Sequence, residues 1–396
     1  MPLYSTAKKI VQKISNLNYI AYFAGGFVRD YIMKLPYNDI DIATNAPIDV
    51  LTTLFPKTIP IGVNFGIIVI VEDGYSFEVA LFREESGYVD GRRPSKIVVT
   101  TPKEDALRRD FTINGMFYDP LKDVIYDYVN GRKDVERGVV RAIGDPHRRF
   151  LEDRLRMIRA VRYAARFRFA IDPQTIEAII YHSTTLFPAV SMERIWQEFV
   201  KMTHSSHIDE ALIMLHRFNL LQVIFPELEK LSIKDVEKLV KKIPLFHKDV
   251  PPIAIFLELF PLITLSEKLL LSDYLKLSNK EKKLIEEMEM WKRTDNFDDY
   301  DWTQIYAMPN SAICQSIEAI HSDNQNFNYV HKTRRHHLAN AIKRMQERTT
   351  IVKAHHLIKR GVRPGEEMGA LLKKAERIAV NYSISSPEEI LNIVFE

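Results

Sequence analysis

The sequence of 396 residues has a single cysteine, no long apolar run and no segment of low complexity. Because Cys314 stands alone, an intramolecular disulfide is excluded; this is typical of proteins in a reducing compartment, and we expect a cytoplasmic protein. No apolar span of roughly 18 residues occurs, and the N-terminal residues lack an uninterrupted apolar stretch, so we expect neither a membrane helix nor a signal peptide. The net charge of +3 is small, so a nucleic-acid site would depend on local clusters of basic residues.

The order of the secondary-structure signals predicts an α+β protein. Short runs rich in β-branched and aromatic residues, at 67–71, 76–82 and 124–128, lie within the first 145 residues. From about Asp145, helical periodicity dominates. We therefore expect an α+β head followed by an all-α remainder, with domain boundaries near residues 145 and 220.

A glycine pair stands between a predicted strand and a predicted helix. Gly25 and Gly26 follow the apolar run Ile20–Ala24 and precede the helical pattern Phe27–Leu35. Backbone N–H groups at the start of a helix bind phosphate oxygens, and glycine permits a close approach. The pair is therefore predicted to bind a phosphate group.

Three acidic residues follow at positions that suit metal-dependent chemistry. Asp39 and Asp41 are two residues apart, so on a strand both would project from one face, with Cα atoms about 7 Å apart. That spacing suits two Mg²⁺ ions about 3.5–4 Å apart, as used in nucleotidyl transfer. Glu78 alternates with apolar neighbours on a predicted core strand, where a carboxylate is costly unless a metal or a basic residue compensates its charge. The alternative for Glu78 is an edge-strand acid that faces solvent.

The segment Leu107–Asn114 combines basic, acidic and amide side chains. Arg109 can bind a triphosphate oxygen through its planar fork. Asp110 can accept, and Asn114 can donate, hydrogen bonds to ribose hydroxyls. The alternative is a helix start with a solvated cluster of charges.

An arginine-rich helix is predicted from about residue 152 to residue 168. Eight arginines and no lysine lie between residues 148 and 168, which favours fork-shaped recognition of phosphates or base edges. Asp153, Arg156, Arg159 and Arg162 recur at every third position and would form one polar stripe. Asp153 could accept from the exocyclic amine of adenine or cytosine while Arg156 donates to the ring, which would reject guanine and uracil. A solvated, salt-bridged helix is the alternative.

Taken together, these segments resemble the class II tRNA nucleotidyltransferase and bacterial poly(A) polymerase family, most closely its CCA-adding enzymes. The motifs that carry the resemblance are, in chain order, GGFVRD with DID, FEVALFR, YVDGRRP, RRDFTIN, YDYVNGRKDVERGVVRAIGDP and EDRLRMIRAVRYAARF. The resemblance implies a polymerase-β-like nucleotidyltransferase head at 1–145 and a neck with the base-reading helix at 146–220. It further implies a helical body at 221–330 and a helical, tRNA-binding tail at 331–396.

The resemblance also implies roles for the residues near the glycine pair and the carboxylates. Gly26, Arg29 and Arg109 would bind the triphosphate and the sugar. Mg²⁺ would be held by Asp39 and Asp41, together with Glu78.

By the same resemblance, the arginine-rich helix would act as an amino-acid template for the incoming base. Asp153 and Arg156 would read the base, and Arg159 and Arg162 would support them and the phosphates. Residues 86–102 would form a mobile loop that helps the change from C to A addition.

The resulting hypothesis is a tRNA nucleotidyltransferase that adds or repairs the 3′-terminal CCA of tRNA from CTP and ATP and releases pyrophosphate. The strand signature at 62–67 and the tail segment at 357–365 favour CCA addition. A template-independent poly(A) polymerase, an A-only enzyme of the same family and a non-catalytic RNA-binding module are the alternatives. The oligomeric state is left open.

Histidines in the last 70 residues, including His331, lack the order of ligands that a metal-dependent phosphohydrolase needs. We expect them to join neighbouring Lys and Arg side chains in a basic face for the tRNA backbone. An ordinary solvated helix surface is the alternative.

Overall fold

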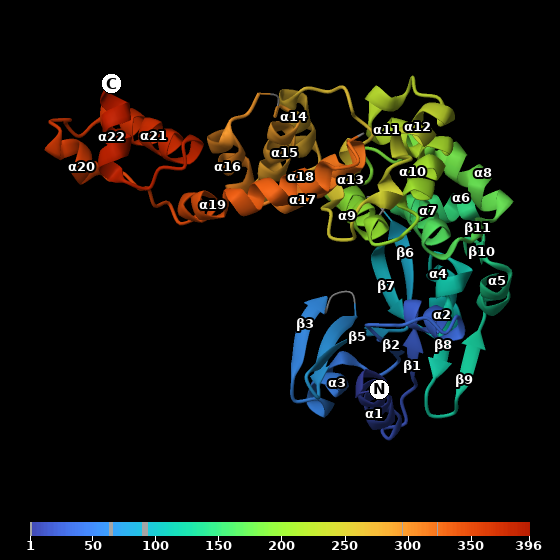
Figure 1. Ribbon diagram of the computed structural model, residues 1–396. Helices are drawn as coiled ribbons and strands as arrows, with labels where there is room; N and C mark the ends of the chain where they lie inside the picture. The colour runs from blue at the N-terminus through green and yellow to red at the C-terminus, as the bar shows by residue number, and fades with distance from the viewer. Residues whose placement is uncertain (1, 63–65, 89–93, 295, 323) are drawn as a thin grey trace. The chain divides into compact units, whose positions relative to one another are not determined.

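The computed structural model describes residues 2–62, 66–88, 94–294, 296–322 and 324–396 (Figure 1). The chain divides into two compact units, Met1–Val240 and Lys241–Glu396. Within the first unit the strands of the large sheet lie at one end and a group of helices at the other (Figure 1). The predicted α+β head followed by helices is confirmed.

A seven-stranded mixed sheet forms the head, with strand order β3-β4-β5-β2-β1-β8-β9. Among the described strands of this sheet, only β2 and β5 pair in parallel, with Ile42 opposite Val79, and the other pairs are antiparallel. Buried aromatic side chains such as Phe23, Phe77 and Phe117 fill the core beside the sheet. The strands are β1 (Ala21–Ala24), β2 (Asp41–Thr44), β3 (Thr58–Gly62), β4 (Ile67–Glu72), β5 (Tyr75–Leu81), β8 (Met116–Asp119) and β9 (Val124–Asp127).

Five α-helices accompany the described strands of the head. α1 packs on β1 and β5, and α2 packs on β1 and β8. The helices are α1 (Pro2–Ser15), α2 (Gly26–Ile32), α3 (Ile48–Leu54), α4 (Pro102–Arg108) and α5 (Gly131–Arg137).

A hairpin occupies much of the segment predicted to be a mobile loop. β6 (Arg83–Tyr88) and β7 (Pro94–Val99) pair antiparallel, so residues 94–99 form a strand. The candidate loop residues Asp90, Arg92 and Arg93 lie outside the described residues, as do residues 63–65 of the strand signature.

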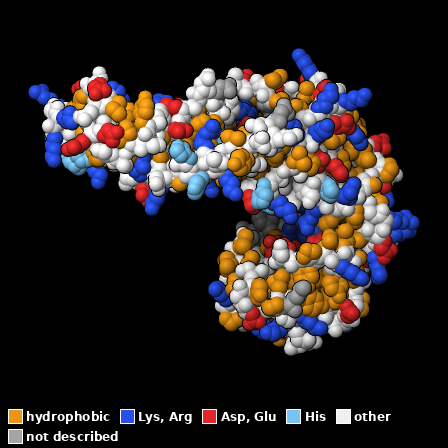
Figure 2. All heavy atoms as spheres, viewed as in Figure 1, with side chains coloured by type: hydrophobic (Ala, Val, Ile, Leu, Met, Phe, Trp, Pro, Cys, Tyr) orange, Lys and Arg blue, Asp and Glu red, His pale blue; other side chains and the backbone are white. Residues whose placement is uncertain are grey.

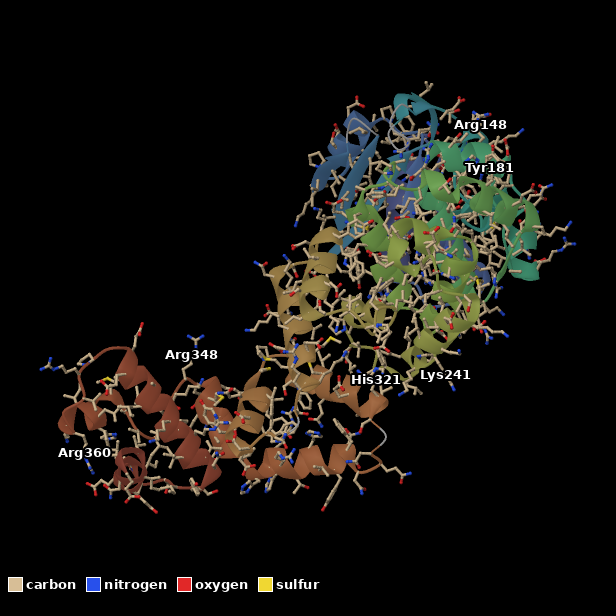
Figure 3. All side chains as sticks on the ribbon, turned by 90° about the horizontal axis from the view of Figure 1, so that it is seen from above. Arg148, Tyr181, Lys241, His321, Arg348 and Arg360 are labelled. Carbon is tan, nitrogen blue, oxygen red and sulfur yellow. The ribbon has the colours of Figure 1, made fainter. Side chains whose placement is uncertain are left out.

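Seven α-helices complete the first unit, and the arginine-rich α7 packs against α9 and α10. The apolar positions Leu155, Ile158 and Val161 of α7 are buried, as their spacing predicts. Arg148 and Tyr181 project from neighbouring helices on the outside of this group (Figure 3). The helices are α6 (Pro146–Glu152), α7 (Leu155–Phe167), α8 (Pro173–His182), α9 (Met192–Thr203), α10 (Ile208–Arg217), α11 (Leu220–Ile224) and α12 (Ile233–Val240), and β10 (Val139–Val140) pairs with β11 (Ala170–Ile171) beside them.

The described part of the second unit is helical. Capping boxes start two of its helices, with Thr264 and Glu267 before α14 and Ser278 and Glu281 before α15. Among the described residues, no helix combines the length and the apolar character that a membrane crossing requires. The helices are α13 (Pro252–Leu257), α14 (Leu265–Tyr274), α15 (Asn279–Trp291), α16 (Asp299–Ala307), α17 (Ser311–His321), α18 (Phe327–His337), α19 (Ala339–Gln346), α20 (Ala354–Lys359), α21 (Glu366–Asn381) and α22 (Pro387–Phe395).

His331 is an exception to the predicted basic face. It is buried, and its Nδ1 lies 2.7 Å from Tyr306 Oη. Burial, together with Arg334 and Arg335, lowers the pKa of His331 to about 4. The prediction failed here because α18 packs this position against the aromatic side chains of α15 and α16, including Trp302.

Candidate active site

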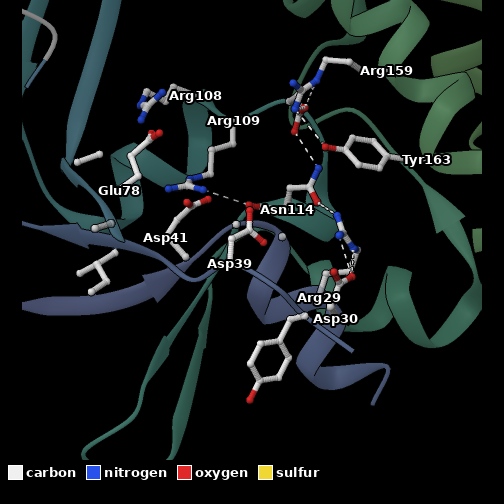
Figure 4. A pocket seen from close by; sticks show the side chains of 18 of the residues that line it. Arg29, Asp30, Asp39, Asp41, Glu78, Arg108, Arg109, Asn114, Arg159 and Tyr163 are labelled. Atoms are coloured by element: carbon white, nitrogen blue, oxygen red, sulfur yellow. Dashed lines mark hydrogen bonds and ion pairs between the residues drawn. The ribbon is translucent and has the colours of Figure 1, made fainter. Parts of the chain in front are cut away.

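A cavity of about 900 Å³ opens in the first unit, where the head meets α6 and α7 (Figure 4). Every residue that the sequence predicted for the site lines this cavity, although the residues come from five separate segments of the chain. They are Gly25, Gly26, Arg29, Asp39, Asp41, Glu78, Arg109, Asp110, Asn114, Asp153, Arg156, Arg159 and Arg162.

The glycine turn lies between β1 and α2, as predicted, although α2 ends at Ile32. Gly25 has φ +64°, a left-handed conformation that favours glycine. A Cβ atom on Gly25 would lie 3.3 Å from Arg109 Nη1 and 3.8 Å from Asp41 Oδ2. The absence of a side chain therefore keeps the backbone open beside a guanidinium and a carboxylate.

Asp41 lies between Glu78 and Asp39 at the start of the interior strand β2 (Figure 4). Asp41 is the first residue of β2, whereas Asp39 precedes the strand, so the prediction that both lie on a strand holds only for Asp41. The parallel pairing of Ile42 with Val79 brings Glu78 level with Asp41. β5 is an interior strand, so the edge-strand alternative for Glu78 is wrong; its carboxylate is instead exposed to the cavity.

The crowding of these carboxylates changes the acidity of Asp41. Its side chain is exposed to the cavity but enclosed by protein on its other sides. This enclosure, together with Glu78 and then Asp39, raises the pKa of Asp41 to about 6, although Arg109 acts in the opposite direction. A bound cation would relieve the repulsion.

The donor set fits Mg²⁺ shared with a substrate. Among the described residues, no three His, Cys, Asp or Glu side chains lie together as a ready-made set of metal ligands. Mg²⁺ usually takes one or two protein carboxylates and completes its shell with waters and substrate phosphates. Asp39 and Asp41 meet that requirement.

Asp105 orients two arginines at the cavity. Its Oδ2 accepts from Arg109 Nε (3.1 Å) and Nη2 (3.0 Å), and its Oδ1 accepts from Arg108 Nε at 2.8 Å. Burial alone would raise the pKa of Asp105, but Arg109 and Arg108 hold it below its usual value. Asp105 was not predicted, although its spacing of three and four residues from Arg108 and Arg109, at the end of α4, is a detectable signal.

Asp110 and Asn114 belong to a buried network. Arg159 donates to Asp110 Oδ2 through Nε (2.8 Å) and Nη2 (2.5 Å), and Asn114 Nδ2 donates to Asp110 Oδ1 at 3.2 Å. Burial opposes ionisation, yet Arg159 and Arg156 hold the pKa of Asp110 at about 2. Arg29 Nη1 donates to Asn114 Oδ1 at 2.6 Å.

The alternative of a solvated cluster at a helix start is therefore wrong for this segment. α4 ends at Arg108, and Asp110 and Asn114 are buried. Contact of either side chain with ribose stays a prediction, since both already bond to protein groups.

The arginine-rich stripe begins differently from the prediction. The predicted helix is interrupted between α6 and α7. Asp153 has extended backbone angles there (φ −150°, ψ 107°), so it lies just outside the helix that carries Arg156. Its Oδ1 accepts from Leu155 N at 3.1 Å. Asp153 and Arg156 nevertheless line the same cavity.

Three arginines of α7 are paired with carboxylates and largely shielded, so the solvated alternative is wrong for Arg156, Arg159 and Arg162, whereas Arg166 is exposed. Arg156 Nη1 donates to Glu152 Oε2 (2.8 Å) and to the Arg149 carbonyl oxygen (3.2 Å), while its Nη2 donates to the Arg108 carbonyl oxygen at 3.3 Å. Arg162 is buried, and its Nε donates to Glu198 Oε2 at 2.7 Å. Four residues that make these pairs were not predicted: Asp105 and Glu152 lie within four residues of their arginines, whereas Arg194 and Glu198 are distant in the chain from their partners.

Two separate parts of the chain match known protein families. Residues 21–141 match the family described as Poly A polymerase head domain. Residues 168–231 match the family described as Probable RNA and SrmB- binding site of polymerase A.

Two bacterial relatives in sequence are both named CCA-adding enzyme. The protein of Pediococcus pentosaceus is 41% identical over 210 residues, which cover 53% of this chain and 52% of that protein. The protein of Staphylococcus saprophyticus is 39% identical over 217 residues, which cover 54% of each chain. The chain thus spans about half the length of the relatives that it matches in sequence.

Solved structures match over nearly the whole chain. The Bacillus stearothermophilus CCA-adding enzyme in complex with CTP is 25% identical, with a TM-score of 0.82 over 100% of this chain and 97% of that chain. The Thermotoga maritima CCA-adding enzyme complexed with tRNA, at 20% identity and a TM-score of 0.66 over 98% and 93% of the chains, shows the shared fold. Through residues 21–141 and 168–231 and these likenesses, the chain is similar to the class II tRNA nucleotidyltransferase and poly(A) polymerase family.

Proposed function

We propose that this protein adds or repairs the 3′-terminal CCA of tRNA, using CTP and ATP and releasing pyrophosphate. The observation that carries the proposal is one cavity that holds both a carboxylate group, Asp39, Asp41 and Glu78, and an Asp153–Arg156 pair. The first group suits nucleotidyl transfer, and the second suits recognition of a base. The relatives named CCA-adding enzyme, one of them in complex with CTP, support the same reaction.

In the proposed reaction, the 3′ hydroxyl of the RNA attacks the α-phosphorus, the bond to the β-phosphate breaks, and pyrophosphate leaves. Asp39 and Asp41, with Glu78 beside them, would hold Mg²⁺. Bound Mg²⁺ supplies activation of the hydroxyl and neutralisation of the triphosphate charge. Arg109, which Asp105 orients, would bind phosphate oxygens beside the open backbone at Gly25.

Base selection follows from donors and acceptors. Cytosine and adenine each present an exocyclic amine next to an acceptor nitrogen, whereas guanine and uracil present a carbonyl next to an N–H. A carboxylate only accepts and a guanidinium only donates, so Asp153 and Arg156 together fit C and A. Three N–H groups of Arg156 are engaged by the protein, which holds the guanidinium still and leaves others for the base.

We further propose that the tail at 331–396 contacts the tRNA backbone. Basic and histidine side chains are spread over the visible face of these helices (Figure 2). Arg334 and Arg335 stack on Trp302 and Tyr306, so the most available cations are the exposed ones, such as Lys332, Lys343, Lys359, Arg360 and Arg363. The domain division at 145, 220 and 330 belongs to this proposal, as does a cytoplasmic location, which the buried free thiol of Cys314 supports.

One experiment tests the reaction. The protein is incubated with tRNA that lacks its 3′ end, with Mg²⁺ and with CTP and ATP supplied singly and together, and the product lengths are read. Addition of C, C and A that then stops is expected. Long adenosine tails would indicate a poly(A) polymerase, addition of a single A to tRNA ending in CC alone would indicate an A-only enzyme, and no incorporation would indicate an RNA-binding module.

A further inference from the structure

Arg194, on α9, contacts Asp153 from outside the cavity. Its Nη2 donates to Asp153 Oδ2 at 2.8 Å, and the side chains are only 17% and 20% exposed. Asp153 belongs to the described lining of the cavity, and Arg194 does not. Arg194 would therefore act on a bound nucleotide through Asp153.

Two hydrogen bonds fix the orientation of the Asp153 carboxylate, which lies between two helices. The backbone of Asp153 is extended between α6 and α7, so the side chain does not share the regular packing of either helix. Oδ1 is held by Leu155 N at 3.1 Å and Oδ2 by Arg194. An ionised carboxylate has about four acceptor sites, so two remain for a base.

The direction of this carboxylate matters for selection. A fixed acceptor rewards an exocyclic amine and penalises the carbonyl of uracil or guanine at the same place. A carboxylate free to rotate could turn away from the carbonyl, which would remove much of the penalty. Selectivity therefore depends on the groups that hold the carboxylate as well as on the carboxylate itself.

We propose that Arg194 is a positioning residue for base selection, which holds Asp153 in the orientation that accepts from the amine of cytosine or adenine. The inference rests on the proposed function. The contact spans 41 residues of sequence and joins α9 to the turn between α6 and α7. A residue that only joined these elements would affect all nucleotides alike.

The test measures kcat/KM for CTP, ATP, UTP and GTP separately, with tRNA lacking its 3′ end, for the wild-type protein, Arg194→Ala and Arg194→Lys. In Arg194→Ala the preference for CTP over UTP, and for ATP over GTP, should fall about 10- to 100-fold, the range that one base-reading pair supplies. Arg194→Lys keeps the charge but not the planar fork, so its preference should be intermediate.

A double-mutant comparison isolates the action through Asp153. With Asp153→Ala already in place, adding Arg194→Ala should leave the preference among the four nucleotides unchanged. The matched control is Arg217→Ala, which removes an exposed arginine of α10 that is absent from the described lining of the cavity. It should keep the wild-type preference.

Three results would overturn the inference: an unchanged preference in Arg194→Ala, an equal loss for all four nucleotides in both Arg194 variants, or a further loss in the double variant. Thermal unfolding is recorded for each protein, and if Arg194→Ala does not fold, the graded effect of Arg194→Lys decides. Failure of the wild-type protein to use CTP or ATP would instead refute the proposed function itself.

Discussion

Replacing the Asp41 carboxylate with an amide should stabilise the metal-free protein while removing its activity. The pKa of Asp41 is raised from its ordinary value of 3.8 to about 6 by enclosure and by the neighbouring carboxylates Glu78 and Asp39. A carboxyl group with a raised pKa binds its proton more tightly in the folded state. The contribution of Asp41 to the stability of the folded protein is therefore fully present below about pH 4, and it is lost as the pH rises through about 6.

The size of the stabilisation by Asp41→Asn follows from the shift in the pKa of Asp41. A change from 3.8 to about 6 corresponds to about 3 kcal/mol between the two protonation states. Because Asp41 is exposed to the cavity, solvent screens the repulsion. We therefore expect Asp41→Asn to increase the free energy of unfolding by about 1 kcal/mol at pH 7.5. For a unit of this size, that gain raises the melting temperature by about 2–4 °C.

The assay is scanning calorimetry in EDTA at two pH values, followed by addition of Mg²⁺. At pH 4.5 the gain should shrink to roughly a third of its value at pH 7.5. Mg²⁺ should raise the melting temperature of the wild-type protein more than that of Asp41→Asn. The control is Asp49→Asn, an exposed acid of α3 outside the described lining of the cavity. If Asp41→Asn melts at or below the wild-type temperature in EDTA at pH 7.5, the repulsion argument is refuted.

Three further predictions concern catalysis and binding. Asp39→Ala should lower incorporation at least about 1000-fold and leave tRNA affinity in a filter-binding assay unchanged, since it would remove a proposed Mg²⁺ ligand; retained turnover would exclude the assignment. Arg156→Ala should relax discrimination against UTP and GTP about 10- to 100-fold in single-nucleotide assays; intact discrimination would exclude base reading. Gly25→Ala should raise KM for CTP about tenfold, because its Cβ crowds Arg109 Nη1. Gly74→Ala, with φ +81° and no neighbour within 4 Å, carries the same backbone strain without crowding; equal KM values would contradict this reason.

Local patterns in the sequence predicted the parts of the site but not how they are held. The glycine turn follows from the order strand, turn and helix, and the apolar face of α7 follows from its periodicity, because both depend on neighbours in the chain. The resemblance to a family brought the separate segments into one site. The exposure of Glu78 to the cavity depended on which strands pair in parallel, which no local pattern reveals.

Long-range ion pairs account for most of what was missed. Arg159 binds Asp110 across 49 residues, and Arg162 binds Glu198 across 36 residues. Such pairs decide whether an arginine is solvated or held inside the protein, whereas the spacing of the charges alone is typical of a solvated helix. The break at Asp153 is local instead: this residue ends α6, and its carboxylate accepts from Leu155 N at the start of α7.

The residues that support Asp153 and Arg156, the proposed base-reading pair, constrain any attempt to redesign nucleotide specificity. Exchanging the two charges would place a cation at residue 153 opposite Arg194 and an anion at residue 156 opposite Glu152. Each new side chain would then meet a partner of its own sign in a shielded place, and it would turn away from the base. A variant built to incorporate uracil and guanine therefore requires four coordinated substitutions, two in the reading pair and two in the residues behind it.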